Sequence, residues 1–137
     1  MNPDLQERLQ ECGVSFSALT KSEKVKLLSR WTRGFVDLAE CARHGGTSPL
    51  VSQDQAADTQ FAGFRNVEFF VLPDDTSGMP SFLCEADALP DLRDLVSDTF
   101  TRCDELVMLE SDFRWSAVLV NHGSPQLVGR YFQERAE

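Results

Sequence analysis

Two stretches near the end of the chain decide its fold, namely the apolar run Leu106-Val107-Met108-Leu109 and, after the turn residues Ser111-Asp112, the segment from Trp115 to Asn121. Both are short and rich in β-branched or large apolar residues, as strands are. A second turn at His122-Gly123-Ser124-Pro125 leads into a last run from Leu127 to Phe132. Because such short connections join neighbouring antiparallel strands, the sequence predicts a C-terminal β-meander.

Two further strands are expected before the meander. The first is Val67-Glu68-Phe69-Phe70-Val71-Leu72, which is bounded by Pro73-Asp74-Asp75. The second is Ser81-Phe82-Leu83-Cys84-Glu85. Phe113 and Trp115 are two positions apart, so a strand would place them on one face and Arg114 on the other. A meander of this kind typically buries one face and leaves the other open.

The best-marked helix begins after Thr20, because Thr20 and Glu23 have the spacing of a capping box. Apolar residues then recur at intervals of three and four, and the pattern stops at His44-Gly45-Gly46. The stripe consists of Val25, Leu28, Trp31, Phe35, Leu38 and Ala42. A single amphipathic helix is therefore expected, weakened by up to ~1 kcal/mol at the internal Gly34.

Shorter helices are expected at residues 3–11 and from Pro90 to about Arg102. Residues 45–60 are polar and without a clear period, which predicts a long loop. With 137 residues the chain has the length of one domain. The sequence thus predicts a single α+β domain over 1–137, with N-terminal helices packed on a mainly antiparallel sheet and one further helix between strands.

The composition narrows the class of protein. The first residues resemble no secretory signal, and no apolar run has the length of a membrane span, so a cytoplasmic protein is expected. Cys12, Cys41, Cys84 and Cys103 have none of the short spacings of metal ligands and are expected to be buried free thiols. The sequence contains no known catalytic or nucleotide-binding motif, which favours a protein without cofactor or metal and favours a non-enzyme over an enzyme.

The net charge of −9 is concentrated in one segment, since residues 74–112 account for all of it. This distribution argues against a nucleic-acid binder, which needs a basic surface for phosphates. Six acidic side chains of this region are candidates for one negative surface: Asp87, Asp91, Asp94, Asp98, Asp104 and Glu105. Such a surface is either a solvated face that keeps the protein soluble or a docking site for a basic partner.

A basic ridge is expected on the exposed side of the capped helix, formed by Lys26, Arg30 and Arg33. The simplest interpretation is again a solvated face. If this ridge met the acidic surface of a second copy, the two could support a weak homodimer.

A second candidate site is a pocket near His122, with Trp115 and Asp112 beside it. The pocket would lie between the sheet and the loop 45–60, and an imidazole near an acid or a thiol could carry out acid–base chemistry. Trp115 is equally well explained as a core residue. This site would make the protein a small-molecule-binding domain or a modest enzyme.

The segment Asp112-Phe113-Arg114-Trp115-Ser116-Ala117-Val118, followed by His122-Gly123, resembles the C-terminal hairpins of small acidic bacterial toxin-immunity-type proteins. The resemblance covers about the final third of the chain. It implies tight binding of a basic toxin domain through an acidic face. The first hypothesis is therefore a protein-binding module of the immunity or inhibitor type, and the alternative is the ligand-binding pocket near His122.

Overall fold

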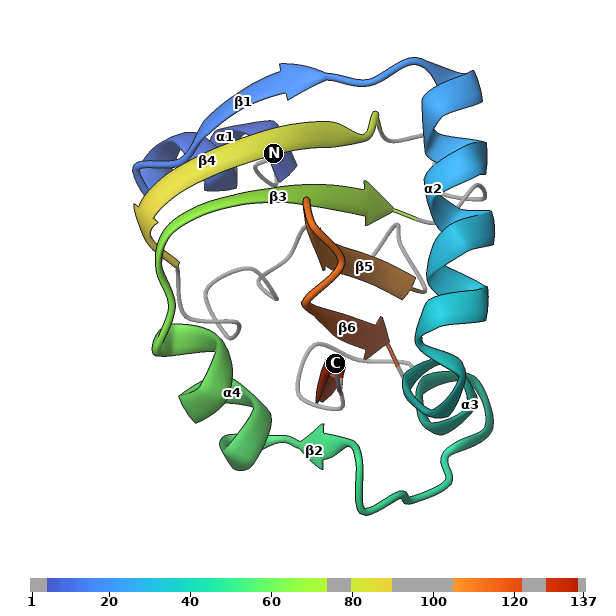
Figure 1. The fold of residues 1–137 in the computed structure, drawn as a ribbon. Helices are drawn as coiled ribbons and strands as arrows, with labels where there is room; N and C mark the ends of the chain where they lie inside the picture. Colours follow the sequence, from blue (N-terminus) through green and yellow to red (C-terminus); the bar gives the residue numbers. More distant parts are fainter. Residues whose placement is uncertain (1–4, 74–79, 90–104, 122–127, 136–137) are drawn as a thin grey trace.

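The computed structural model describes residues 5–73, 80–89, 105–121 and 128–135 and confirms an α+β fold, with helices near the N-terminus and a C-terminal strand meander on an antiparallel sheet (Figure 1). Its helices are α1 (Leu5–Glu11), α2 (Lys21–Gly34), α3 (Val36–His44) and α4 (Gln55–Ala62). Its strands are β1 (Ser15–Ala18), β2 (Ser52–Gln53), β3 (Arg65–Pro73), β4 (Phe82–Ala88), β5 (Glu105–Glu110), β6 (Trp115–Asn121) and β7 (Val128–Glu134).

The seven strands form one antiparallel sheet in the order β1-β4-β3-β5-β6-β7-β2. The meander is β5-β6-β7, in which Val107 lies opposite Val118, and Val118 opposite Tyr131. The strands expected at 67–72 and 81–85 are β3 and β4, and both are longer than expected. The edge strand β1 was not predicted, because its four residues are mostly small, polar and exposed.

Both faces of the sheet are buried, which corrects the expectation of one open face. One face packs against α1 and α4, through Leu9, Ala57 and Phe61. The other packs against α2 and α3, through Trp31 and Leu38. All four residues from Leu106 to Leu109 are buried for this reason. A continuous apolar run, in place of alternation, is the pattern of a strand covered on both sides.

The single helix expected from Thr20 to His44 is wrong, because it is broken at Phe35 into α2 and α3. Phe35 leaves the helical region at φ −127° and is fully buried. In an unbroken helix the Leu38 N–H would bond to the carbonyl of Gly34. It instead donates to the side-chain oxygen of Gln133 on β7 at 3.0 Å. The break turns α3 onto the sheet and leaves Val25, a member of the predicted stripe, 55% exposed.

The long loop expected at 45–60 is also only partly correct. Residues 52–53 form β2, which pairs with β7, and α4 begins at Gln55. The helix was missed because its buried residues among 55–62 are only Ala57 and Phe61, too few to show a period. It places Phe61 in the core and leads the chain directly into β3.

The helix expected at about 90–102 lies outside the described residues. Among the residues that are described, no helix is long and apolar enough to cross a membrane. Cys41 and Cys84 are buried, as expected, and Cys12 is partly buried. Burial raises the pKa of the Cys84 thiol to about 12, so this group stays protonated and packs as a small apolar side chain.

Candidate functional site

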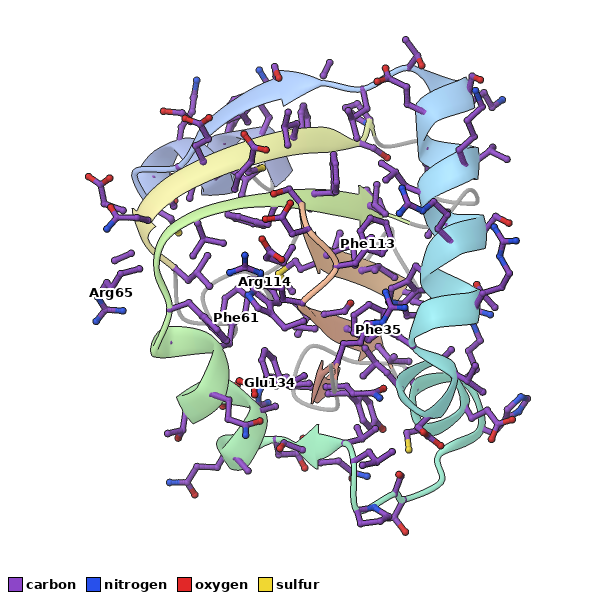
Figure 2. The ribbon with its side chains drawn as sticks, in the orientation of Figure 1. Phe35, Phe61, Arg65, Phe113, Arg114 and Glu134 are labelled. Carbon is purple, nitrogen blue, oxygen red and sulfur yellow. The ribbon has the colours of Figure 1, made fainter. Side chains whose placement is uncertain are left out.

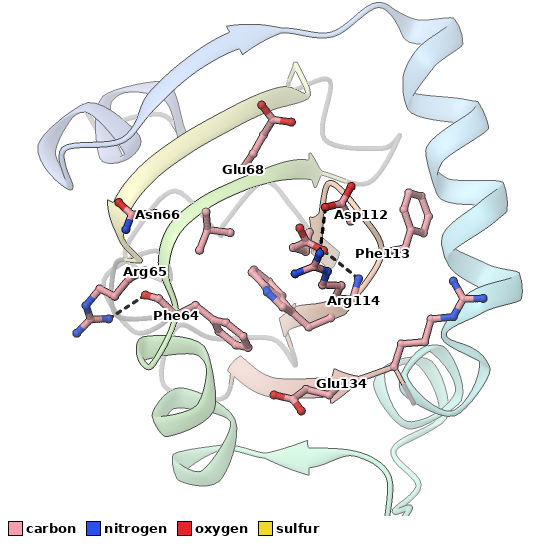
Figure 3. Close-up of a pocket in the computed structure, with 12 residues that line it drawn as sticks. Phe64, Arg65, Asn66, Glu68, Asp112, Phe113, Arg114 and Glu134 are labelled. Atoms are coloured by element: carbon pink, nitrogen blue, oxygen red, sulfur yellow. Dashed lines mark hydrogen bonds and ion pairs between the residues drawn. The ribbon is translucent and has the colours of Figure 1, made fainter. Parts of the chain in front are cut away.

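A hollow of about 780 Å³ lies at one end of the sheet, between α4 on one side and α2 on the other (Figure 3). Three segments that are far apart in the sequence line it. They are the start of β3, the β5–β6 turn and the end of β7, and they meet because β3, β5, β6 and β7 are successive strands. The lining residues are Phe64, Arg65, Asn66, Val67, Glu68, Glu110, Asp112, Phe113, Arg114, Trp115, Glu134 and Arg135.

The floor of the hollow is aromatic. Trp115 begins β6 and is almost completely buried. The ring of Phe64 stacks on Trp115 with 5.1 Å between ring centroids, and Phe132 stacks on it at 5.8 Å. Phe61 from α4 meets the same indole edge-on at 5.5 Å. Aromatic rings at these centroid distances attract each other, which holds the floor in place. Phe64 is only partly buried and is the exposed part of the floor.

The backbone around the hollow is strained at two positions. Asn66 has φ +55° and Phe113 has φ +62°, the left-handed region that costs most side chains about 1–2 kcal/mol. Both residues line the hollow. Asn tolerates this conformation, whereas Phe is a poor fit and must be held there by its surroundings.

Phe113 is held in this conformation because its side chain is buried on the α2 side of the β5–β6 turn. Its N–H donates to the Glu110 carbonyl at 2.8 Å, and the guanidinium of Arg30 lies 4.1 Å from the centre of its ring. Phe113 belongs to the core beneath α2, whereas Trp115 belongs to the core beneath α4. The expectation that the two rings share a face is therefore wrong, and Figure 2 shows Phe113 on the α2 side, away from Phe61.

Two of the three arginines at the rim are already engaged. The Arg65 guanidinium donates to the carbonyls of Ala62 and Phe64 at 2.7 and 2.8 Å, closing the end of α4. Arg114 forms an ion pair with Asp112 at 3.8 Å, with both side chains at least 70% exposed. An exposed pair at this distance contributes little stability. Glu110, which is buried, accepts the backbone N–H of Arg114 at 3.0 Å and fixes the turn.

Two carboxylates at the rim stand apart from these contacts. Neither Glu68 nor Glu134 forms a side-chain hydrogen bond or ion pair with any residue in the described parts of the chain. Both are exposed, and Figure 3 shows them on opposite sides of the hollow with the aromatic floor between them. They are the groups that a ligand in the hollow would meet without first breaking an internal contact.

A smaller hollow of about 360 Å³ continues the first along the sheet. The two share Asn66, Val67 and Glu68, and the smaller one adds Glu85 and Asp87 from β4. None of its described lining residues is basic. Glu68 lies directly opposite Glu85 in the β3–β4 pair, an arrangement of like charges that costs stability. The two hollows together form one groove, here called the acidic groove.

The predicted site residues are distributed as follows. Asp112 and Trp115 line the large hollow, and Asp87 lines the small one. Glu105 lies elsewhere, since β5 begins at the far end of β3, roughly 25 Å from Asp87 at ~3.3 Å per strand residue. It forms a two-bonded ion pair with Arg43 and is 16% exposed. Asp91, Asp94, Asp98, Asp104 and His122 lie outside the described residues.

Sequence reasoning did not single out Phe64, Glu68 or Glu134. The one available signal was Glu68, a charge that interrupts the apolar run of β3. Within the described ranges no three or more His, Cys, Asp or Glu side chains are placed to hold a metal ion.

In comparisons with known proteins, no family model, no curated protein and no solved structure matches this chain.

Proposed function

We propose that this chain is a protein-binding module that holds a positively charged segment of its partner in the acidic groove. The observation that carries the proposal is the pair of carboxylates Glu68 and Glu134, which line the same hollow on opposite sides of its aromatic floor and have no partner in the described residues. Lysine and arginine side chains match this combination, because they join an apolar stem to a charged head.

The local charge supports a basic ligand. Among the described lining residues, six carboxylates stand against three guanidinium groups: Glu68, Glu85, Asp87, Glu110, Asp112 and Glu134 against Arg65, Arg114 and Arg135. Arg65 is tied to backbone carbonyls and so contributes least to binding. The whole chain has a net charge of −9, which would steer a basic partner toward it.

The site proposed here differs in place from the acidic surface expected over residues 87–105. It keeps Asp87 of that surface and adds Asp112, which was expected in the pocket near His122; it does not include Glu105, whose carboxylate is paired with Arg43. The residues 112–115, which carry the resemblance to immunity-type proteins, line the groove. A basic toxin domain is accordingly one partner of the proposed chemistry.

The proposal is tested by measuring the binding of a fluorescent peptide of alternating lysine and leucine residues at low and high salt. We expect binding that weakens as salt screens the carboxylates. The double variant Glu68→Gln/Glu134→Gln is expected to weaken binding about three- to tenfold at low salt, because each exposed pair contributes up to ~1 kcal/mol.

Two controls separate the groove from the overall charge. Glu40→Gln removes an exposed carboxylate from α3, away from the groove, and is expected to leave peptide affinity nearly unchanged. Asp91→Asn/Asp94→Asn/Asp98→Asn tests the alternative acidic surface. If Glu40→Gln weakens peptide binding as much as Glu68→Gln alone or Glu134→Gln alone, the charge of the whole protein binds the peptide and the groove assignment is wrong.

A second function is favoured by the size of the large hollow. A volume of about 780 Å³ lies within the range of small-molecule pockets, roughly 300–1,000 Å³, and the partly exposed ring of Phe64, stacked on the buried Trp115, offers an apolar surface. Thermal-shift screening of cationic aromatic compounds tests this alternative. Stabilisation that is lost in Phe64→Ala, without peptide binding, would favour a small-molecule site over a protein-binding one.

A further inference from the structure

β1 is an edge strand that lacks the usual protection against pairing with another chain. It is the first strand of the sheet, and within the described parts of the chain it pairs only with β4 (Figure 1). Its sequence, Ser15-Phe16-Ser17-Ala18, contains no charged residue and no proline, and three of its four residues are exposed. Natural edge strands usually carry lysine, proline or a bulge, because an open row of N–H and C=O groups recruits a further strand.

The hydrogen-bond pattern shows which backbone groups point outward. The Leu19 N–H donates to the Ser81 carbonyl at 2.8 Å, so Leu19 faces β4. In antiparallel strands the bonded positions alternate, so Ser15 and Ser17 also face β4, whereas Phe16 and Ala18 direct their N–H and C=O groups away from the sheet. The Val14 N–H also points away from β4 and is taken by the Leu9 carbonyl, in agreement with this alternation.

Among the described residues, the elements that flank β1 leave this edge clear. α2 follows β1 and runs from the edge down across the sheet, and α1 lies behind β1 and β4 in Figure 1. Phe16 is anchored by an edge-to-face contact with Phe82, at 5.1 Å between ring centroids. The strand therefore keeps its geometry without a partner. The opposite edge differs, since the two-residue β2 gives way to Asp54 at φ +51° and then to α4.

We propose that two copies of this chain associate through their β1 edges, as antiparallel strands related by a two-fold axis at Ser17. Phe16 of each copy would then face Ala18 of the other, and their outward N–H and C=O groups would form four hydrogen bonds. The two Ser17 residues would form a non-hydrogen-bonded pair with Cα atoms about 4.5 Å apart. A second copy fits this edge because the same two residues supply both sides of every bond.

The edge is self-complementary in a further respect. The residues brought together are small or uncharged, so no like charges meet along the new strand pair. The contact is short, and interfaces of this size form weak, concentration-dependent dimers. The joined sheets would continue through both copies, and the contact would lie beside the acidic groove, because Ser15 also lines the smaller hollow. The pairing rests on the edge hydrogen bonds alone and does not depend on the proposed function.

Sedimentation equilibrium over a range of concentrations tests the association. Wild type is expected to be a reversible dimer at high concentration. Ala18→Pro removes one outward N–H per copy without breaking a bond to β4, and proline is tolerated at such edge positions. Two lost hydrogen bonds are expected to raise the dimer dissociation constant about 25-fold, at about fivefold each.

Ser17→Lys is a second variant, because it places two positive charges opposite each other and should also favour the monomer. Oxidation of Ser17→Cys should join the two copies through a disulfide between the substituted positions, identified by mass spectrometry against the native cysteines. Ser29→Cys, exposed on α2, is the matched control and should not cross-link at the same concentration. A wild type that stays monomeric at all concentrations, or equal cross-linking of both variants, would overturn the proposal.

Discussion

The indole N–H of Trp31 donates a hydrogen bond to the hydroxyl oxygen of Ser116 at 2.9 Å, which joins α2 to the middle of the sheet. Both residues are fully buried. The Ser116 hydroxyl in turn donates to the Met108 carbonyl at 2.6 Å, so one oxygen satisfies two neighbours. These two bonds therefore fix the position of α2 over β5 and β6.

Ser116→Ala is expected to lower the free energy of unfolding by about 1–3 kcal/mol, because the buried indole N–H loses its acceptor. Trp31→Phe removes the same bond together with part of the ring. The double variant should cost less than the sum of the two single changes, since each removes the shared bond. Urea unfolding of the four proteins measures this coupling, and strictly additive losses would show that the bond contributes nothing.

Phe113 should give an unusual order of stability between two small replacements. Glycine normally destabilises relative to alanine, but at φ +62° it relieves backbone strain of about 1–2 kcal/mol. Both variants lose the buried ring and its contact with Arg30. We therefore expect Phe113→Gly to be more stable than Phe113→Ala by about 1 kcal/mol in denaturant unfolding. The normal order would mean that the turn relaxes once the ring is removed.

The elements that the sequence identified correctly are those whose signal is local. The Thr20 and Glu23 capping box is formed as expected, with both reciprocal bonds near 3 Å. The strands β3 to β7 followed from apolar runs and turn residues. Each of these patterns predicts its element from only a few neighbouring residues.

Apart from α4, whose own pattern was too weak, the misses depend on distant contacts. The break at Phe35 is stabilised by Gln133, which lies nearly a hundred positions later and receives the Leu38 N–H. β1 exists because β4 pairs with it, and its own sequence favours no strand. The groove combines three segments from 64 to 135, and nothing in one segment shows that Glu68 and Glu134 flank the same aromatic floor. Asp112 and Trp115 do line this hollow, but the pocket expected from the sequence was placed near His122 and the segment 45–60, and no residue of 45–60 lines it.

The capping box predicts a pH dependence at the start of α2. The backbone N–H and then the hydroxyl of Thr20 bond to the Glu23 carboxylate, with a smaller effect from Lys26, and they lower the pKa of that carboxyl below its ordinary value of 4.5. A lowered folded-state pKa gives stability that is present above the ordinary value and is lost as the pH falls through the folded-state value. Glu23→Gln should therefore be less stable than wild type at neutral pH.

This difference should shrink as the pH falls below about 4.5, and thermal unfolding from neutral to acidic pH measures it. Thr20→Ala is the control, because it removes the hydroxyl acceptor, worth ~1 kcal/mol, without removing a charge. A Glu23→Gln difference that stays constant with pH would show that the carboxylate charge is not what stabilises the cap.

The cysteines should differ in reactivity according to burial. Burial raises the pKa of Cys84 to about 12 and, with Asp37 and Glu40 adding to it, raises that of Cys41. The thiolate is the reactive form, so both should react slowly with a thiol reagent in the native protein. Cys12 is more exposed and should react sooner. Peptide mapping after timed alkylation distinguishes the three, and rapid native modification of Cys84 would contradict its burial.

Glu68 and Glu85 provide the sharpest test of whether the groove is a binding site or only a solvated surface. Like charges directly opposite on paired strands destabilise the sheet, so Glu68→Gln is expected to raise the free energy of unfolding by about 0.2–1 kcal/mol. The gain should be largest at low salt, because salt screens the repulsion in wild type. Adding Glu85→Gln should give little more, since the repulsion is already gone. Glu40→Gln, with no facing acid on a strand, should give no comparable gain.

If the groove is a binding site, the same Glu68→Gln change should also weaken binding of the lysine–leucine peptide, so that stability rises while affinity falls. A gain in stability with unchanged affinity would leave these two carboxylates as a solvated pair, and the proposed function would fail at this site.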